Sequence, residues 1–440
     1  MAILSGMLCG RPCPRHRLTT GSSLRSGHAV PLMAIPSSAE LMPHRIPSPN
    51  PRRWPIALLA LQLFLVTFSV NLQAPLVPHY AAASGHGAGA QALAFACYVG
   101  ALVPALLFLA GLSDRVGRRL PLAVALLLGL VGTWLTLRWP TLVALGGARA
   151  CYGLATGLVA GSGTAYMTEL YGDREDAATR GAALVAASTS LGFGSGALAT
   201  GVCLIVAPST LPPASLWAYL PFAFVAALAV AVLPAPARRP NVPWLRWPVL
   251  APGTAPLGVA ILLAWAAVGV VIGVVPSALA AHGHAAWAGF ATFFVVSTGL
   301  LFQPAARRMA PVRAVRVGLV IVPLGFVVLA LGVVYVNLPV LLAGAVVASS
   351  ACYGFTYLGG LAAVNAAVDP AMRARAAAGY FLFAYFGFSV PVVTSGWLAD
   401  RFGMSVALAL LAAALIAGSA ALGVALRRER PTSATLRRRV

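Results

Sequence analysis

A short charged segment between two long apolar runs holds the clearest set of residues that could do chemistry. The runs from Ala90 to Ala110 and from Leu120 to Leu137 contain no charged residue. The segment between them must therefore join two membrane-spanning helices, where an acid and several bases can form ion pairs or can simply fix the topology. Its glycine and charged positions are Gly111, Asp114, Arg115, Gly117, Arg118 and Arg119.

A second candidate is Arg149, about eight residues into an apolar run over residues 141–168. At a rise of ~1.5 Å per residue, Arg149 lies about 12 Å along a helix and well inside the hydrocarbon region. A charge at that depth is costly and indicates a functional role, such as binding an anionic group through the two-pronged guanidinium. The alternative is an arginine that snorkels outward or caps carbonyl groups.

The acidic residues are equally informative, because none of the nine lies at the centre of an apolar run. Proton coupling in membrane transport commonly uses a buried carboxylate with a raised pKa. The sequence therefore predicts that the usual proton relay is missing. The remaining candidates for coupling are Asp114, Glu169, Asp400 and Arg149 with a bound anion.

The composition identifies the elements that must position these residues. Of 440 residues, 60% are hydrophobic and 9% are charged, which excludes an ordinary soluble protein. The net charge of +21 would suggest a nucleic-acid partner in a soluble chain. Because the basic residues fall in tails and short loops, membrane orientation explains the charge, and we expect no nucleic-acid partner.

The chain is predicted to be an all-α polytopic membrane protein with about twelve spans. Arginines concentrate in the even-numbered turns, whereas the odd-numbered turns hold only Arg138 and Arg401, so both termini are expected in the cytoplasm of a bacterial inner membrane. The predicted spans are 56–77, 90–110, 120–137, 141–168, 181–206, 215–234, 254–279, 285–304, 317–336, 338–365, 376–396 and 404–426.

The two halves of the chain look like repeats. The sequence Ala-Cys-Tyr-Gly occurs at 150–153 and again at 351–354. We expect one six-helix bundle over 54–234, a cytoplasmic linker over 235–252 and a second bundle over 253–427. Residues 396–403 look like a second copy of the charged turn, although counting helices places them on the outer face.

The chain ends do not belong to this pattern. Residues 1–53 mix Arg, Pro, Ser and His without periodicity, which predicts a disordered cytoplasmic segment. The alternative is a translation start placed too early. Residues 428–440 are predicted to form a basic cytoplasmic tail.

The turn Gly-x-x-Asp-Arg-x-Gly-Arg-Arg resembles the signature between the second and third helices of the major facilitator superfamily of secondary transporters. Arg149 followed by Gly153 and Gly157 resembles the fourth-helix pattern of that family, in which the arginine is implicated in coupling or substrate binding. Glu169 followed by Arg180 resembles the acid-then-arginine pattern after the fourth helix. The resemblance covers roughly residues 54–427.

This resemblance implies two parallel six-helix halves, a substrate site near the midplane between them and transport by alternating access. It also implies that Asp114 and Glu169 form an interdomain latch with the neighbouring arginines, which breaks as the halves rock. The alternative is a set of isolated, solvated ion pairs worth ~0 to 1 kcal/mol each.

The resemblance further places the substrate site among the first, fourth, seventh and tenth spans. An amide in hydrocarbon needs partners or water, so Asn71 and Gln73 stand out there. Hydrogen bonding between helices is the alternative for each polar residue. The other candidates are Tyr152, Thr156, Trp265, Tyr353, Tyr357 and Asn365.

We therefore expect a secondary exporter or antiporter of a small organic solute, with an anionic substrate indicated by Arg149. Residues 192–201 resemble the glycine-rich motif of drug-proton antiporters only incompletely. The alternatives are an importer of a metabolite, such as an organic acid or a sugar, and a non-transporting membrane sensor. We expect a monomer in the lipid bilayer, with a proton as a candidate coupling ion and with no enzymatic activity, metal or cofactor.

Overall fold

The computed structural model describes residues 53–109, 111–172, 176–235 and 247–428, and every regular element in these ranges is helical. Twelve helical segments there are long and apolar enough to cross a membrane. The predicted segment 1–53, the linker 235–252 and the tail 428–440 lie wholly or largely outside the described residues, and the predicted domain boundaries stay a prediction.

The first half contains six spans, which agree with the predicted ones to within a few residues at each end. Continuously apolar segments form helices because hydrocarbon offers no partner to an open backbone N–H or C=O group. The elements are α1 (Arg53–Leu72), α2 (Val77–Ala83), α3 (Ala88–Phe108), α4 (Leu112–Val116), α5 (Arg119–Arg138), α6 (Leu142–Tyr171), α7 (Ala177–Val206) and α8 (Ala214–Ala229).

The second half repeats this plan with six further spans. Its elements are α9 (Ala255–Gly273), α10 (Val275–Ala281), α11 (Trp287–Ser297), α12 (Gln303–Arg307), α13 (Pro311–Val334), α14 (Leu338–Ser349), α15 (Thr356–Ala366), α16 (Arg373–Phe402) and α17 (Met404–Arg428). Each half begins with a broken span, because Pro75 follows the end of α1 and Pro276 follows the end of α9.

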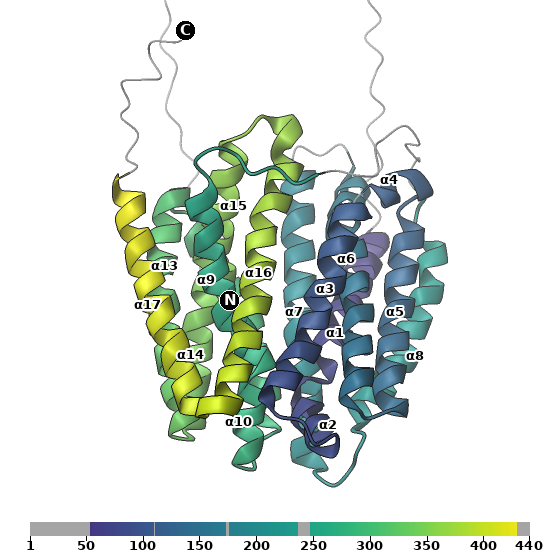
Figure 1. Ribbon diagram of the computed structural model, residues 1–440. Helices are drawn as coiled ribbons and strands as arrows, with labels where there is room; N and C mark the ends of the chain where they lie inside the picture. The colour runs from purple at the N-terminus through teal and green to yellow at the C-terminus, as the bar shows by residue number, and fades with distance from the viewer. Residues whose placement is uncertain (1–52, 110, 173–175, 236–246, 429–440) are drawn as a thin grey trace, which may run out of the picture. The chain divides into compact units, whose positions relative to one another are not determined.

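The predicted arrangement of two six-helix halves is confirmed. Within the first half α3 packs against α6 and α1 against α7, whereas in the second half α9 packs against α16 and α13 against α14. The halves meet where α3 contacts α16 and where α7 contacts α11. Figure 1 shows α4 at one end of the helices and α2 and α10 at the other end. We call these the α4 end and the α2/α10 end.

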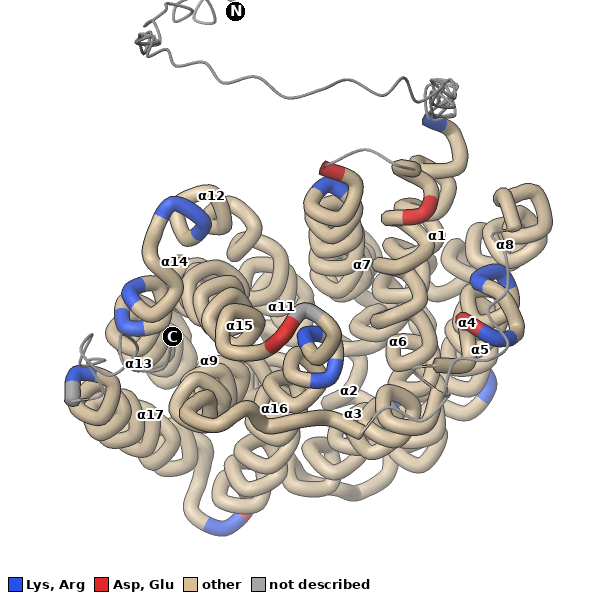
Figure 2. The backbone as a smooth tube through the Cα atoms, turned by 90° about the horizontal axis from the view of Figure 1, so that it is seen from above, with Lys and Arg blue, Asp and Glu red and all other residues tan. Residues whose placement is uncertain are grey.

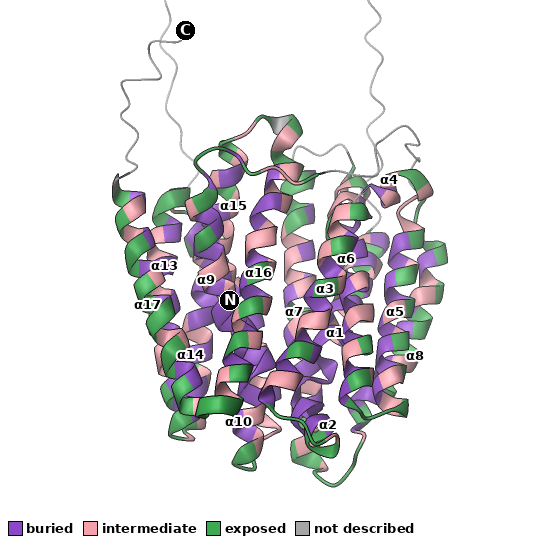
Figure 3. Ribbon diagram, viewed as in Figure 1, coloured by how far each residue is buried: buried purple, intermediate pink, exposed green. Residues whose placement is uncertain are grey.

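Large apolar side chains are exposed along the outer surfaces of the helices (Figure 3). Val143 is 86% exposed, Leu301 76% and Phe222 68%. So much exposed apolar surface is unfavourable in water, so these side chains are suited to contact with lipid.

The predicted second copy of the charged turn has a different structure from the first. The eleventh span was predicted to end at residue 396, but α16 continues to Phe402 and includes Asp400. Asp400 contacts the first residues of α3, so it lies at the α2/α10 end, as helix counting predicted. Both copies close with a left-handed glycine, because Gly117 has φ 94° and Gly403 has φ 88°.

Candidate functional site

Arg149 lies about two turns after the start of α6, with 1% of its surface exposed. Its Nη1 atom donates a hydrogen bond of 3.3 Å to Oδ1 of Asn71, and its Cζ atom lies 4.9 Å from the ring centroid of Phe95. In the described part of the chain, the Nε and Nη2 atoms of Arg149 have no hydrogen-bond acceptor. A buried guanidinium thus retains donors that an anionic group could satisfy.

The side chain of Asn71, which accepts the hydrogen bond from Arg149, is itself fixed by a second hydrogen bond. It lies in the last turn of α1, just before the break at Pro75, and its Nδ2 atom donates to the carbonyl oxygen of Phe193 on α7 at 3.0 Å. Its amide therefore joins α1, α6 and α7. Gln73, just after α1, is also buried, but its Nε2 atom donates to the carbonyl oxygen of Val70, three residues earlier, at 3.3 Å.

Aromatic rings of the second half lie next to the Phe95 ring that contacts Arg149. The ring of Phe95 lies 5.0 Å from that of Phe388 on α16, and Phe388 lies 5.9 Å from Trp265 on α9. Trp265 also contacts Tyr353 at 5.8 Å and Tyr385 at 5.5 Å between ring centroids. We call these five residues the aromatic cluster; it extends from the cation in one half to the core of the other.

Tyr353 belongs to a π-helical turn over Ser350–Phe355, between α14 and α15. A π turn interrupts the regular hydrogen bonding of a helix, and such turns occur frequently at functional sites. Tyr357 follows one turn later and lies 5.6 Å from the ring of Phe381. The tenth span thus presents two half-buried tyrosines beside the aromatic cluster.

The repeated Ala-Cys-Tyr-Gly sequence occupies equivalent spans but different surroundings. Tyr152 in α6 is fully buried, and its hydroxyl lies 3.2 Å from Oγ1 of Thr133 on α5. Thr156 donates to the carbonyl oxygen of Tyr152 at 2.9 Å, within the same helix. Tyr152 and Thr156 therefore form hydrogen bonds within their own half, whereas Tyr353 packs against Trp265.

The structure thus brings together only some of the predicted site residues. Arg149 contacts Asn71, and Trp265 contacts Tyr353, with rings of the aromatic cluster between the two pairs. Asn365 stands apart, because twelve residues of helix place it about 18 Å along the axis from Tyr353. Phe95, Phe388 and Tyr385 were not predictable from the sequence, since an aromatic residue in an apolar run gives no signal that separates a site from lipid contact or core.

The charged turn forms a compact cluster at the α4 end. Nη1 of Arg118 pairs with Oδ1 of Asp114 at 2.7 Å, and Nη2 pairs with Oε1 of Glu169 at 2.8 Å. Arg118 also donates to Oγ of Ser113 at 2.7 Å. Partial burial lowers the pKa of Arg118, but its bonds to Glu169 and Asp114 outweigh burial and raise that pKa above its ordinary value.

These contacts join α4 to α6 within the first half. Arg119 donates to the carbonyl oxygen of Leu233, also in the first half, and Arg180 pairs with Asp176 at 2.5 Å at the start of α7. Gly111 precedes α4, and Gly117 ends it. The role of Arg115 and of the whole motif in a latch between the halves stays a prediction.

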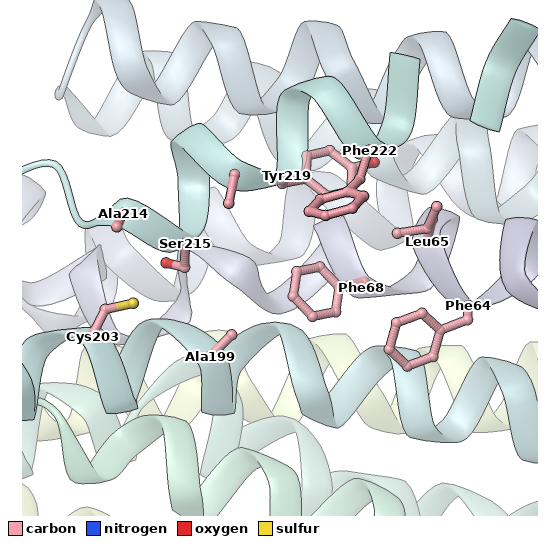
Figure 4. Close-up of a pocket in the computed structure, with 10 residues that line it drawn as sticks. Phe64, Leu65, Phe68, Ala199, Cys203, Ala214, Ser215, Tyr219 and Phe222 are labelled. Atoms are coloured by element: carbon pink, nitrogen blue, oxygen red, sulfur yellow. The ribbon is translucent and has the colours of Figure 1, made fainter. Parts of the chain in front are cut away.

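A cavity of about 380 Å³ lies away from these residues, between α1, α7 and α8 (Figure 4). Its lining is almost wholly apolar and includes Phe64, Phe68, Cys203 and Phe222. Because Phe222 is 68% exposed, the cavity opens on the outer surface of the helices rather than toward Arg149.

Within the described ranges, no group of three or more His, Cys, Asp or Glu residues could hold a metal ion.

The comparisons with known proteins agree with this architecture. Residues 59–252 match the sequence model of the Major Facilitator Superfamily. No curated protein sequence matches the chain at a significant level.

Solved structures of transporters share the fold over most of the chain. The nucleoside transporter NupG has 14% identity and a TM-score of 0.64, covering 84% of this chain and 99% of its own. The human organic anion transporter MFSD10 has 19% identity and a TM-score of 0.59, covering 85% and 100%. The peptide transporter POT, solved with sulfate, has 16% identity and a TM-score of 0.65, covering 85% and 94%.

The family match covers the first half and the linker, and the shared fold extends through the second half. The chain is therefore a multi-pass membrane protein whose first half matches the Major Facilitator Superfamily and whose fold is that of the solved transporters.

Proposed function

We propose that this chain moves a small organic anion with an apolar or aromatic body out of the cell by alternating access. The observation that supports it most strongly is the buried Arg149, whose Nε and Nη2 atoms lack an acceptor among the described residues. An uncompensated charge in a membrane protein is costly to retain, so a ligand that supplies the counter-charge accounts for it.

The aromatic cluster supports the second part of the substrate description. Trp265 and Tyr353 belong to the second half: Trp265 contacts Phe388 of the Phe95 and Phe388 pair that adjoins Arg149, and Tyr353 contacts Trp265. A ligand with a carboxylate or similar group on an apolar ring would place its charge on one half and its ring on the other. The similar solved structures carry different substrate names and share the fold alone, so the substrate class is argued from these residues.

The membrane potential supports the outward direction of transport. A bacterial inner membrane is negative inside, and moving one negative charge outward gains about 2.3 kcal/mol per 100 mV. An anion exporter of this kind needs no buried carboxylate, and each acidic residue in a described span lies near the end of its helix, as do Glu169 and Asp400. This proposal takes both termini to be cytoplasmic. A proton remains a candidate coupling ion through these marginal acids.

Flux in inside-out membrane vesicles tests the proposal. Radiolabelled benzoate, its neutral analogue benzamide and the aliphatic anion acetate serve as probes, each with and without an imposed potential. We expect benzoate to accumulate in wild-type vesicles and benzamide to be a poor substrate. Replacing Arg149 by Gln should abolish benzoate uptake, and Arg149→Lys should restore it only in part because the bidentate fork is lost.

Arg138→Gln is the matched control, since Arg138 also lies beside an aromatic ring, Trp139, but at the end of α5. It should transport normally. Equal uptake of benzoate and benzamide, or normal benzoate uptake by Arg149→Gln, would contradict the anion proposal. Uptake only by right-side-out vesicles would contradict export and favour import of an organic acid.

A further inference from the structure

A carboxylate of the second half caps a helix of the first half at the α2/α10 end. Oδ1 of Asp400 accepts the backbone N–H of Ala88 at 2.7 Å, and Oδ2 accepts that of Gly89 at 2.8 Å. The first N–H groups of any helix lack partners within the helix. Gly87, at the N-cap position of α3, has no side chain to supply one, so α16 provides the cap from the other half.

Three glycines leave room for this close approach. A Cβ atom on Gly87 would lie 2.5 Å from Oδ1 of Asp400, and one on Gly89 would lie 2.8 Å from Oδ2. One turn before Asp400, a Cβ atom on Gly396 would lie 2.7 Å from the carbonyl oxygen of Ala88. Any of these side chains would occupy space that the carboxylate or the backbone of the opposite half now fills.

Other contacts between the halves lie toward the same end. Oγ of Ser277 on α10 donates to Oε1 of Gln91 on α3 at 2.6 Å. Between α7 and α11, a Cβ atom on Gly289 would lie 2.3 Å from the carbonyl oxygen of Ala197. The halves are therefore closed together at the α2/α10 end, and alternating access requires this end to open.

The Asp400 contact has the properties of a reversible tether. A negative charge at a helix N-terminus is favourable, and a charged acceptor strengthens both hydrogen bonds. Asp400 is nonetheless solvent-exposed, so water can replace the N–H groups when the halves separate. The contact can thus bias an equilibrium without locking it.

The sequence around Asp400 parallels the charged turn at the opposite end. Asp114 and Asp400 each begin an Asp-Arg-x-Gly segment whose glycine has nearly the same backbone conformation, φ 94° and ψ 159° at Gly117 and φ 88° and ψ 157° at Gly403. Each segment leads directly into the next span, α5 or α17. The two ends of the molecule thus carry related acidic elements.

We propose that Asp400 is a positioning residue of the transport cycle, whose carboxylate biases the halves toward the state closed at the α2/α10 end and is released when that end opens. The proposal rests on the alternating access of the proposed function but not on the identity of the substrate. It can therefore fail while the anion proposal stands, and the anion proposal can fail while this one stands.

Electron–electron distance measurements test it on the full chain in lipid nanodiscs. Spin labels replace the exposed residues Ala83 of α2 and Ala281 of α10, in a transport-competent background without native cysteines. We expect Asp400→Asn to increase the long-distance population several-fold, up to about tenfold. Asp369→Asn, the same change at an exposed acid before α16, should leave the distances unchanged.

Gly89→Ala separates the tether from helix stability, because alanine favours the helix but displaces the carboxylate. It should also increase the long-distance population, and combining it with Asp400→Asn should add little. Wild-type distances in both single variants would overturn the proposal. An Asp400→Asn effect accompanied by a Gly89→Ala shift toward the short distance would also overturn it, because helix stability would then be the cause.

Discussion

Arg149 of α6 lies with its guanidinium carbon 4.9 Å from the ring centroid of Phe95 on α3. This ring lies between the cation and the aromatic residues of the second half, because Phe95 in turn contacts Phe388 at 5.0 Å. A cation above an aromatic face is stabilised by ~0.5 to 2 kcal/mol, which offsets only part of the cost of burying its charge. The remaining cost is what a bound anion would relieve.

The first prediction concerns stability without substrate. Arg149→Met replaces a buried charge by an apolar side chain of similar length, so we expect an unchanged or raised Tm, with a gain of ~1 to 4 kcal/mol at most. Transport of the anionic substrate should be lost in the same variant. Thermal unfolding of the purified protein in detergent measures the Tm, and a clear decrease would mean that Arg149 is a structural residue.

The second prediction concerns selectivity for a ring. Trp265→Leu removes the aromatic partner of Tyr353 and Tyr385 but keeps an apolar side chain. Aromatic pairs contribute ~0.5 to 1.5 kcal/mol beyond burial, so the preference for benzoate over acetate should fall about two- to tenfold. Competition between the two anions in vesicles measures this preference. Trp217→Leu, on the exposed surface of α8, should not change it.

The third prediction concerns the close packing of α7 on α11. In Gly289→Ala the new Cβ would lie 2.3 Å from a backbone oxygen of Ala197, which cannot move as a side chain can. The α2/α10 end should therefore close poorly, and transport should slow about tenfold or more. Gly423→Ala is the control, because a Cβ there meets nothing within 4 Å. Equal flux in the two variants would contradict this account of the glycines.

The fourth prediction concerns the cluster at the α4 end. Glu169→Gln removes a partly exposed ion pair with Arg118, so a loss of only ~0.5 to 1 kcal/mol in the free energy of unfolding is expected. The pKa of Arg118 is higher in the folded protein than in the unfolded chain. The ion pair therefore stabilises the fold fully at any pH below the pKa of the unfolded chain, and this stabilisation is lost only as the pH rises through the folded-state pKa. The difference in Tm between Glu169→Gln and wild type should therefore stay constant from pH 7 to about pH 10. A difference that shrinks over this range would contradict the pairing.

The spans were predictable because continuous apolar runs of about 20 residues have one stable solution in a membrane. The residues at which the spans end were less predictable. The eleventh span was predicted to stop at Gly396, where the sequence resembles a turn, but α16 continues to Phe402, and Asp400 in its last turn caps α3 of the other half. Such a contact joins residues far apart in the chain, and no local pattern reveals it.

The candidate site was predictable only where a residue is unusual for its surroundings. A charge at Arg149 and an amide at Asn71 stand out in hydrocarbon, and the structure places them in contact. A phenylalanine such as Phe388 suits lipid contact and a site equally by composition, so its place beside Phe95 and Trp265 is visible only in the packing. The π turn at Ser350–Phe355 gave no sequence signal beyond the repeat that contains Tyr353.

Charge movement tests the central claim most directly. Proteoliposomes on a solid-supported membrane report the sign and size of the charge carried when benzoate is applied under an imposed potential. We predict that wild type carries net negative charge with benzoate, that an inside-negative potential drives it outward, and that Arg149→Gln carries none. Electroneutral benzoate transport in wild type, or an unchanged current in Arg149→Gln, would contradict the claim that Arg149 receives a transported anion.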